Sequence, residues 1–233
     1  MKSKNILTQT DVEEELRLAF IQKREPCFKG KIIEGALFQD KTIERGLNFG
    51  AAIILDSISF EGTTIKGNLN FSQAIIRGSL YFGSGKIEGD LNLNDANIKG
   101  VVNLVGTEID GSLNFENLGI AGFLSLAKAR INKNVLLGSA KINDAYHSGL
   151  IIKGDVYLRE TEIFGDLNAE NSFIEGSLDL MGAFIGGNAN LKSAKINNVL
   201  ILKDAKIKGE LITKGMVCKE VVKSIKLDKF FAK

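Results

Sequence analysis

Residues 89–99, which read GDLNLNDANIK, contain the unit that determines the fold of this chain. Leu91 and Leu93 are two positions apart, and so are Ala96 and Ile98. Alternate side chains of a β-strand point to the same face, so each pair has the spacing of a short strand with one inward-facing side. An α-helix would need apolar spacings of three and four residues. The unit therefore predicts two short extended segments joined by tight corners.

The same unit recurs along most of the chain. Isoleucine returns every eleven residues, with one step of ten, at Ile32, Ile43, Ile54, Ile65, Ile76, Ile87, Ile98, Ile109, Ile120, Ile131, Ile142, Ile152, Ile163, Ile174, Ile185, Ile196 and Ile207. A second apolar column with this spacing runs from Phe38 to Leu202, and a glycine column runs from Gly67 to Gly209. Repetition at a fixed short period is typical of a solenoid.

Each turn of the solenoid is expected to contain two units. Eleven residues are too few to enclose a core in one revolution, whereas twenty-two supply four short sides with inward apolar side chains. The isoleucine column then predicts about eight coils and a rod roughly 40 Å long at the usual spacing of strands. Glycine at the six-residue corner fits a turn with positive φ, and Asp144 and Asn198 replace it at two of these corners.

The inward pairs Ala96/Ile98, Ala194/Ile196 and Ala205/Ile207 match the small-then-large pattern of the A-[DN]-L-x-x motif. Over residues 27–218 the chain resembles the pentapeptide-repeat family. That resemblance implies an all-β solenoid, a right-handed quadrilateral β-helix. The eleven-residue unit is five plus six rather than five plus five, so the chain is similar to an undecapeptide variant. One fold hosts unrelated functions, so the resemblance leaves the activity open.

The two termini are predicted to cap the rod. Within residues 1–26, Asp11 could cap a helix whose apolar face holds Val12, Leu16, Ala19 and Phe20 and which Pro26 would end. Residues 219–233 are predicted to be a C-terminal cap or tail with a solvated lysine face. The alternative is a basic amphipathic segment that contacts nucleic acid or an anionic surface.

Composition restricts the chemistry. Thirty basic and 28 acidic residues give a formal charge of +2, and the chain has one histidine. No paired acid and base emerges from the spacing of the outward carboxylates, so we expect no enzyme, no cofactor and no metal. Cys27 and Cys218 are expected in inward positions at opposite ends, too far apart for a disulfide. The first ten residues lack the apolar run of a signal peptide, which favours a cytoplasmic protein with no membrane span.

The candidate partner-binding residues fall in two groups. The register break between Ile142 and Ile152 predicts a bulge or short loop that exposes Tyr146 and His147. The second group is apolar residues in outward positions: Phe164, Phe173, Phe184, Val199, Ile201 and Ile212. Such residues indicate an interface when they form a patch. Packing against the C-terminal tail, a homodimer contact and a partner surface are all open explanations for them.

The function predicted from these observations is a non-enzymatic scaffold or protein-interaction module. We expect a homodimer through the C-terminal end and no direct nucleic-acid binding. One alternative comes from pentapeptide-repeat proteins that resemble DNA in shape and negative charge and modulate topoisomerases or other DNA-acting enzymes. The other is a self-assembling structural protein similar to bactofilins.

Overall fold

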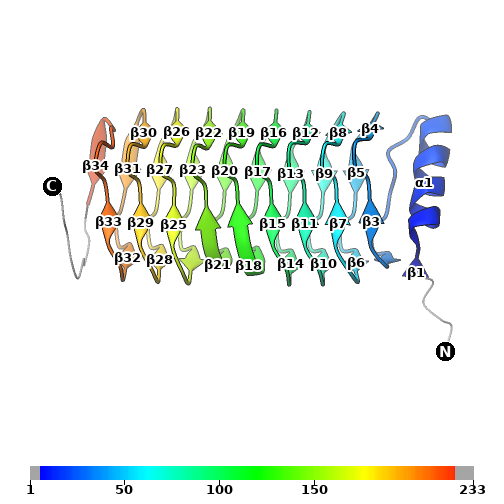
Figure 1. Cartoon of the computed structure of the whole chain (residues 1–233), viewed down its shortest axis with the longest axis horizontal. Coiled ribbons are helices and arrows are strands. Elements are labelled where there is room, and N and C mark those ends of the chain that lie inside the picture. The colour runs from blue at the N-terminus through cyan, green and yellow to red at the C-terminus, as the bar shows by residue number, and fades with distance from the viewer. Residues whose placement is uncertain (1–5, 224–233) are drawn as a thin grey trace.

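The computed structural model describes residues 6–223, except for the side chain of Tyr146. The chain forms a right-handed all-β solenoid of about ten turns, slightly more than the eight expected, with α1 (Gln9–Ile21) across its N-terminal end (Figure 1). Neighbouring coils pair as parallel strands, for example Leu91 with Leu113, and most pairs are 22 residues apart. The predicted four-sided coil is therefore confirmed.

Each coil contributes one short strand to each of four faces, numbered in chain order. Face 1 contains β1 (Ile6–Leu7), β2 (Ile32–Ile33), β6 (Ile53–Ile54), β10 (Ile75–Ile76), β14 (Asn97–Ile98), the first parts of β18 (Gly119–Ser125) and β21 (Lys141–Tyr146), β24 (Glu162–Ile163), β28 (Phe184–Ile185) and β32 (Lys206–Ile207). Face 2 contains β3 (Ala36–Leu37), β7 (Ile58–Ser59), β11 (Leu80–Tyr81), β15 (Val102–Asn103), the last parts of β18 and β21, β25 (Leu167–Asn168), β29 (Ala189–Asn190) and β33 (Leu211–Ile212).

The other two faces are separate sheets. Face 3 contains β4 (Thr42–Ile43), β8 (Thr64–Ile65), β12 (Lys86–Ile87), β16 (Glu108–Ile109), β19 (Arg130–Ile131), β22 (Ile151–Ile152), β26 (Phe173–Ile174) and β30 (Lys195–Ile196). Face 4 contains β5 (Leu47–Asn48), β9 (Leu69–Asn70), β13 (Leu91–Asn92), β17 (Leu113–Asn114), β20 (Val135–Leu136), β23 (Val156–Tyr157), β27 (Leu178–Asp179), β31 (Val199–Ile201) and β34 (Glu220–Val222).

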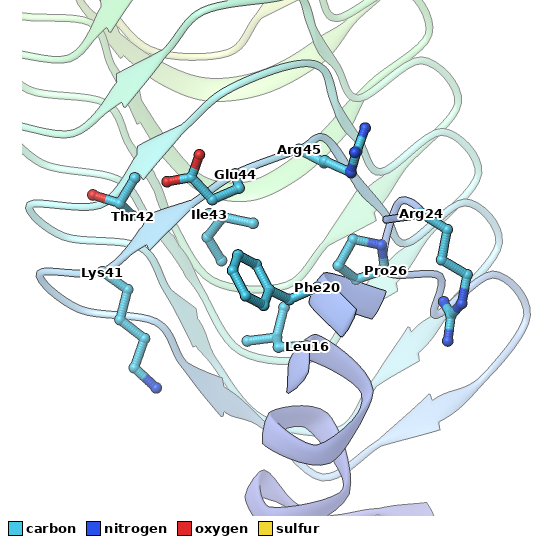
Figure 2. A pocket seen from close by; sticks show the side chains of 9 residues that line it. All are labelled: Leu16, Phe20, Arg24, Pro26, Lys41, Thr42, Ile43, Glu44 and Arg45. Carbon is cyan, nitrogen blue, oxygen red and sulfur yellow. The ribbon is translucent and has the colours of Figure 1, made fainter. Parts of the chain in front are cut away.

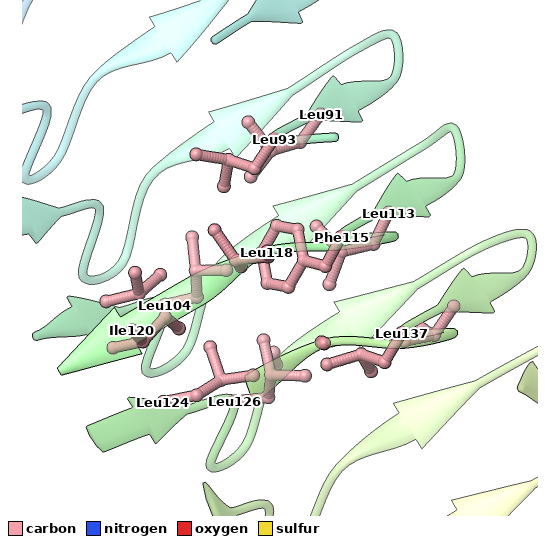
Figure 3. Packing of buried hydrophobic residues seen from close by; sticks show 14 of the residues in the cluster. Leu91, Leu93, Leu104, Leu113, Phe115, Leu118, Ile120, Leu124, Leu126 and Leu137 are labelled. Carbon is pink, nitrogen blue, oxygen red and sulfur yellow. The ribbon is translucent and has the colours of Figure 1, made fainter. Parts of the chain in front are cut away.

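The predicted apolar columns form the core inside the four faces. Figure 3 shows Leu113 and Phe115 of one coil between the side chains of the coils on either side. In the N-terminal half the second column is a phenylalanine stack, with ring centroids 4.8 Å apart for Phe49 and Phe71 and 4.6 Å apart for Phe38 and Phe60. Stacking in register adds to the stabilisation from burial.

Three steps between paired strands span 21 residues instead of 22: one at the N-terminal end, one at the predicted break, and one between β31 and β34, where Val199 pairs with Glu220. Ile33, not Ile32, lies in register with Ile54 and is fully buried, so placing Ile32 in the inward column was wrong by one position. The second 21-residue step lies at the predicted break, where Val135 pairs with Val156. β18 and β21 are extended there and pair along their length, with a bulge between Ile120 and Phe123. The break thus lengthens two strands.

The glycine column has a different role from the one predicted. Of that column, only Gly67 has positive φ among the described residues. The left-handed residues lie at the other corner, and most are not glycine, such as Asp95 and Asn117. Glycine is required in its column because the coils approach closely: a Cβ on Gly89 would lie 2.6 Å from the carbonyl carbon of Gly67. The expectation of a positive-φ glycine corner was therefore wrong.

The N-terminal helix starts three residues earlier than expected. Thr8 is the N-cap, its backbone N–H donates to the Asp11 carboxylate at 2.8 Å, and its hydroxyl accepts from the Asp11 N–H. Asp11 is thus the third residue of a capping box rather than the cap itself. Val12 and Ala19 are buried as predicted, whereas Phe20 is 70% exposed, so its assignment to the buried face was wrong. Phe20 directly follows Ala19, and adjacent helical positions point about 100° apart.

The C-terminal cap is a strand where the structure describes it. Glu220–Val222 forms β34, which pairs with β31 on face 4. The remainder of the predicted C-terminal cap or tail, residues 224–233, lies outside the described residues. Cys27 is exposed and Cys218 is half-buried, so the expected inward position of Cys27 was wrong. The described part of the chain contains no helix that is long and apolar enough to cross a membrane.

Candidate functional site

The structure distributes the predicted partner-binding residues over all four faces. Phe164 and Phe184 lie on face 1, Phe173 on face 3, Val199 and Ile201 on face 4. Tyr146 and Ile212 both belong to face 2, but three coil steps separate their strands. These residues therefore do not form one continuous patch. Val199, Ile201 and Ile212 all belong to the last coils of the rod, but they lie on two different faces.

Lysine side chains lie over two of the predicted aromatic rings. The Lys208 ammonium nitrogen is 5.4 Å from the ring centroid of Phe184, and that of Lys195 is 5.5 Å from the ring centroid of Phe173. A cation over an aromatic face is stabilised by the ring quadrupole. Phe164 lies beside Gly186 of the next coil, which has no side chain to cover it, and Phe164 remains 52% exposed.

His147 lies in the second apolar column and faces the interior. Its side chain is 4% exposed, and its backbone carbonyl accepts from the Ser172 hydroxyl at 2.7 Å and from the Leu150 amide at 3.1 Å. The exposed loop expected for His147 is absent because β21 continues as far as Tyr146. The imidazole thus occupies a position where other coils place leucine or phenylalanine.

The C-terminal end of the rod has two strand edges without a partner among the described residues. β32 pairs only with β28, and β33 pairs only with β29. Faces 3 and 4 differ, because Val217 forms a bridge with Lys195 and β34 pairs with β31. An edge strand presents unpaired backbone groups on which another chain can add a strand.

A half-exposed apolar layer lies beside those edges. Met216, Cys218 and Val221 pack against the core but remain partly accessible, while Val217 is 60% and Val222 37% exposed. The predicted residues Val199 and Ile201 on face 4, and Ile212 on face 2, are half-buried in the same last coils of the rod. We call these eight residues the C-terminal layer. Exposed apolar side chains in a cluster are typical of a contact surface.

Lysines surround the C-terminal layer. Residues 192–223 contain eight lysines and three acidic residues, an excess of five positive charges, although the whole chain has a formal charge of only +2. Opposite charge on a partner would raise the rate of association and orient the complex. This local excess was not recognised from the sequence, because the charges were summed over the whole chain.

Face 4 carries a polar cluster of Asp155, Tyr157, Arg159 and Asp179. The Arg159 Nε donates to Asp179 Oδ2 at 2.5 Å, and the guanidinium lies 5.5 Å from the ring centroid of Tyr157. The Tyr157 hydroxyl donates to Asp155 at 3.1 Å, and this hydrogen bond raises the pKa of Tyr157 above its ordinary value. Asp155 also accepts from the Ser177 amide of the next coil. Arg159 and Asp155 each bond to the next coil, while Tyr157 is held within its own coil, as expected for a stabilising network.

The described residues contain no group of three histidine, cysteine, aspartate or glutamate side chains placed to hold a metal ion. At the N-terminal end, a cavity of about 290 Å³ lies between α1 and β4 (Figure 2). Its lining residues are Leu16, Phe20, Arg24, Pro26, Lys41, Thr42, Ile43, Glu44 and Arg45. The sequence analysis missed this cavity because it placed Phe20 on the buried face of the helix.

In comparisons with known proteins, no family model matches the chain and no curated protein is found to be similar to it, so the functional assignment rests on the geometry of the rod and its ends.

Proposed function

We propose that this chain is a non-enzymatic scaffold, similar to pentapeptide-repeat proteins, that binds an acidic segment of a partner protein through the C-terminal end of its rod. The observation that carries the proposal is the combination of two open strand edges, β32 and β33, with the adjoining C-terminal layer. A strand that adds to an open edge forms backbone hydrogen bonds, while apolar side chains give contact area. The surrounding lysines favour a partner of negative charge.

A second copy of the chain is the other candidate for this surface. A symmetric contact between two C-terminal ends would close without forming fibres and would cover both apolar layers. It would also bring together two surfaces that each carry an excess of five positive charges. Dissolved salt weakens the repulsion between two positively charged surfaces, and it equally weakens the attraction between surfaces of opposite charge. A homodimer of this kind should therefore become stronger as salt increases, whereas a complex with an acidic partner should become weaker.

The arrangement of charge supports this proposal over the DNA-mimic alternative. A mimic of duplex DNA needs a continuous acidic face. On face 3, Lys66 lies between Glu44 and Glu88 in the same outward column, and its ammonium nitrogen is 3.0 Å from Glu44. Basic side chains also interrupt the other faces, for example Arg77 on face 1 and Arg159 on face 4. The capped N-terminal end likewise weighs against end-to-end stacking of the bactofilin type.

The proposal is tested by affinity capture from the native host, followed by mass spectrometry. The intact protein is compared with Val217→Glu/Val222→Glu, which alters the C-terminal layer, and with Ile75→Glu, a matched control on face 1 where the side chain is 42% exposed. We expect a protein partner that the intact chain and the control retain and the double variant loses. Equal capture by all three proteins would contradict the proposal.

Light scattering at low and high salt decides between the two occupants. A monomer at all salt concentrations, together with a captured partner that is released by salt, supports the acidic partner. A dimer that strengthens with salt and is lost in Val217→Glu/Val222→Glu would assign the surface to a second copy.

A further inference from the structure

The N-terminal end of the rod is covered on three of its four faces. On face 1, β1 pairs with β2. On face 2, the Gln9 side chain replaces a strand: its amide nitrogen donates to the Leu37 carbonyl at 3.0 Å, and its oxygen accepts from the Leu37 amide at 2.9 Å. On face 4, Cys27 forms a bridge with Asn48. Face 3 differs, because β4 is the edge of its sheet and pairs only with β8 among the described strands.

The open edge of β4 faces the cavity. The Lys66 amide donates to the Ile43 carbonyl, so the backbone groups of Ile43 face β8. Adjacent residues of a strand direct their backbone groups to opposite edges. Those of Thr42 and Glu44 therefore face the N-terminal end, and their N–H groups have no acceptor within residues 6–223. Both residues also line the cavity.

The remainder of the cavity combines an apolar floor with a rim of three basic residues and Glu44, whose carboxylate is paired with Lys66 at 3.0 Å. Figure 2 shows Leu16 and Phe20 reaching from α1 toward Ile43, with Pro26 beside them. Ile43 is nearly buried, whereas Phe20 is 70% exposed and offers its ring to the open side.

Three basic residues line the rim, and two of them are already paired. Arg24 is bound to Glu15 at 2.5 Å, and Lys41 lies 3.2 Å from Glu13. Arg45 is exposed and has no ion-pair or hydrogen-bond partner among residues 6–223. One guanidinium therefore remains available for an incoming carboxylate, with which it can form a bidentate contact.

We propose that this cavity is a second binding site, which takes an extended segment of a partner protein as an added strand along β4. In the register of the rod, a residue opposite Ile43 would point into the apolar floor and one two positions later would lie near Arg45. The recognised segment is thus a large apolar residue followed, two positions on, by Asp or Glu. Strand addition of this kind gains affinity from backbone hydrogen bonds and specificity from alternate side chains.

The chain's own termini fit this site poorly. Residues 1–5 read MKSKN and contain two lysines and no carboxylate side chain, so they do not complement Arg45. Phe230 is seven residues beyond Lys223, a span of at most about 25 Å. Eight steps of about 4.8 Å, roughly 38 Å in total, separate β34 from β5. The C-terminal tail of the same molecule therefore cannot place its phenylalanines in the cavity. The site is independent of the C-terminal surface discussed above.

The test uses octapeptides selected from a random displayed library on the full-length protein, which are then synthesised for affinity measurements. We expect selected sequences with an apolar residue followed by an acidic one at the second position after it. Phe20→Ser should weaken their binding at least tenfold, while Ile21→Ser, a control with an exposed side chain outside the cavity, should leave it unchanged. Arg45→Gln should also weaken binding about tenfold, and mainly for peptides that retain the acidic residue.

The backbone contribution is tested with Thr42→Pro, which removes one N–H donor that has no acceptor among residues 6–223, and with Thr42→Val, which keeps that donor. Only the proline variant should lose binding, with melting temperature as the check on folding. If that variant unfolds, peptides methylated at single amide nitrogens give the same information. In an added strand only every second peptide N–H bonds to β4, so methylation should weaken binding at alternate positions only. The proposal would be overturned if no peptide were enriched. It would also be overturned if the selected peptides bound Phe20→Ser and Thr42→Pro as tightly as they bind the intact protein. If a peptide of residues 224–233 bound as tightly as the selected peptides, the proposal of a different partner protein would be overturned, and the occupant would be assigned to a second copy of this chain.

Discussion

Glycine 89 illustrates how single residues set the distance between coils. The Asn68 side-chain oxygen accepts from the Asp90 amide at 2.8 Å, and Asp90 in turn accepts from the Ser112 amide at 2.7 Å. These hydrogen bonds run along the rod beside the glycine column. A Cβ on Gly89 would overlap the Asn68 oxygen and the Gly67 backbone. The glycine and the polar residue after it therefore act as a pair.

Gly89→Ala should destabilise the protein by about 2 kcal/mol or more, because backbone atoms must shift to admit the methyl group. Gly119→Ala is the matched control: its Cβ would meet nothing closer than 3.4 Å, and its φ is not in the left-handed range. Urea unfolding of both variants measures the difference. If the two variants were equally stable, the close approach of Gly67 and Gly89 would not be what fixes the distance between their coils.

Ile109 represents the inward column, and Asn97 an outward position of strand β14. Ile109 is fully buried and Asn97 is exposed. Ile109→Ala should cost roughly 2–5 kcal/mol from lost burial and the cavity left behind, whereas Asn97→Ala should be close to neutral. Thermal melts of both variants test this expectation. If both changes proved harmless, the assignment of the columns would be wrong.

At the scale of elements, α1 covers the N-terminal end with side chains that form the hydrogen bonds a neighbouring strand would form with its backbone. The clearest example is Gln9, which makes both hydrogen bonds that a neighbouring strand would make with Leu37. Gln9→Ala should lower the stability by about 1 kcal/mol, since net contributions of such hydrogen bonds are of that order. Amide exchange at Leu37 should accelerate. Gln39→Ala, which loses only a 3.3 Å contact with Glu61, is the control and should leave that exchange rate unchanged.

The attachment of α1 to the first coil should depend on pH through Glu15. The hydrogen bond from Arg24 lowers the pKa of Glu15 below its ordinary value of 4.5, partial burial opposes this effect, and the Cys27 amide adds to the lowering. A lowered pKa means that the unfolded chain binds the proton more readily. The contribution to stability is therefore complete above about pH 4.5 and is lost as the pH falls through the folded-state value.

Melting temperatures of the intact protein and Glu15→Gln between pH 3 and 7 test this dependence. The difference between the two proteins should be largest near neutral pH and should shrink in acid. A difference that stayed constant with pH would exclude ionised Glu15 as the cause.

At the scale of the whole molecule, the sequence predicted the rod but not its ends. The isoleucine column implies a four-sided coil because a strict period leaves few ways to bury each side chain. It could not show that the first coil is one residue short, since Ile32 and Ile33 are both isoleucine and either one fits the pattern. The cavity was missed for a related reason: the helix has no repeat to indicate its orientation, so Phe20 could be assigned to either side. Repetition determines the interior, while the ends depend on individual contacts.

The constant separation of successive coils has a consequence for how such a protein can change its length. Residues 89–110 form one complete turn, and Glu88 would join Gly111 in the same register if that turn were removed, as the pairing of Lys86 with Glu108 indicates. Each deletion or duplication of a turn would change the distance between the two ends by about 4.8 Å and leave both ends intact. The distance between the two proposed binding surfaces can therefore change in equal increments of one turn.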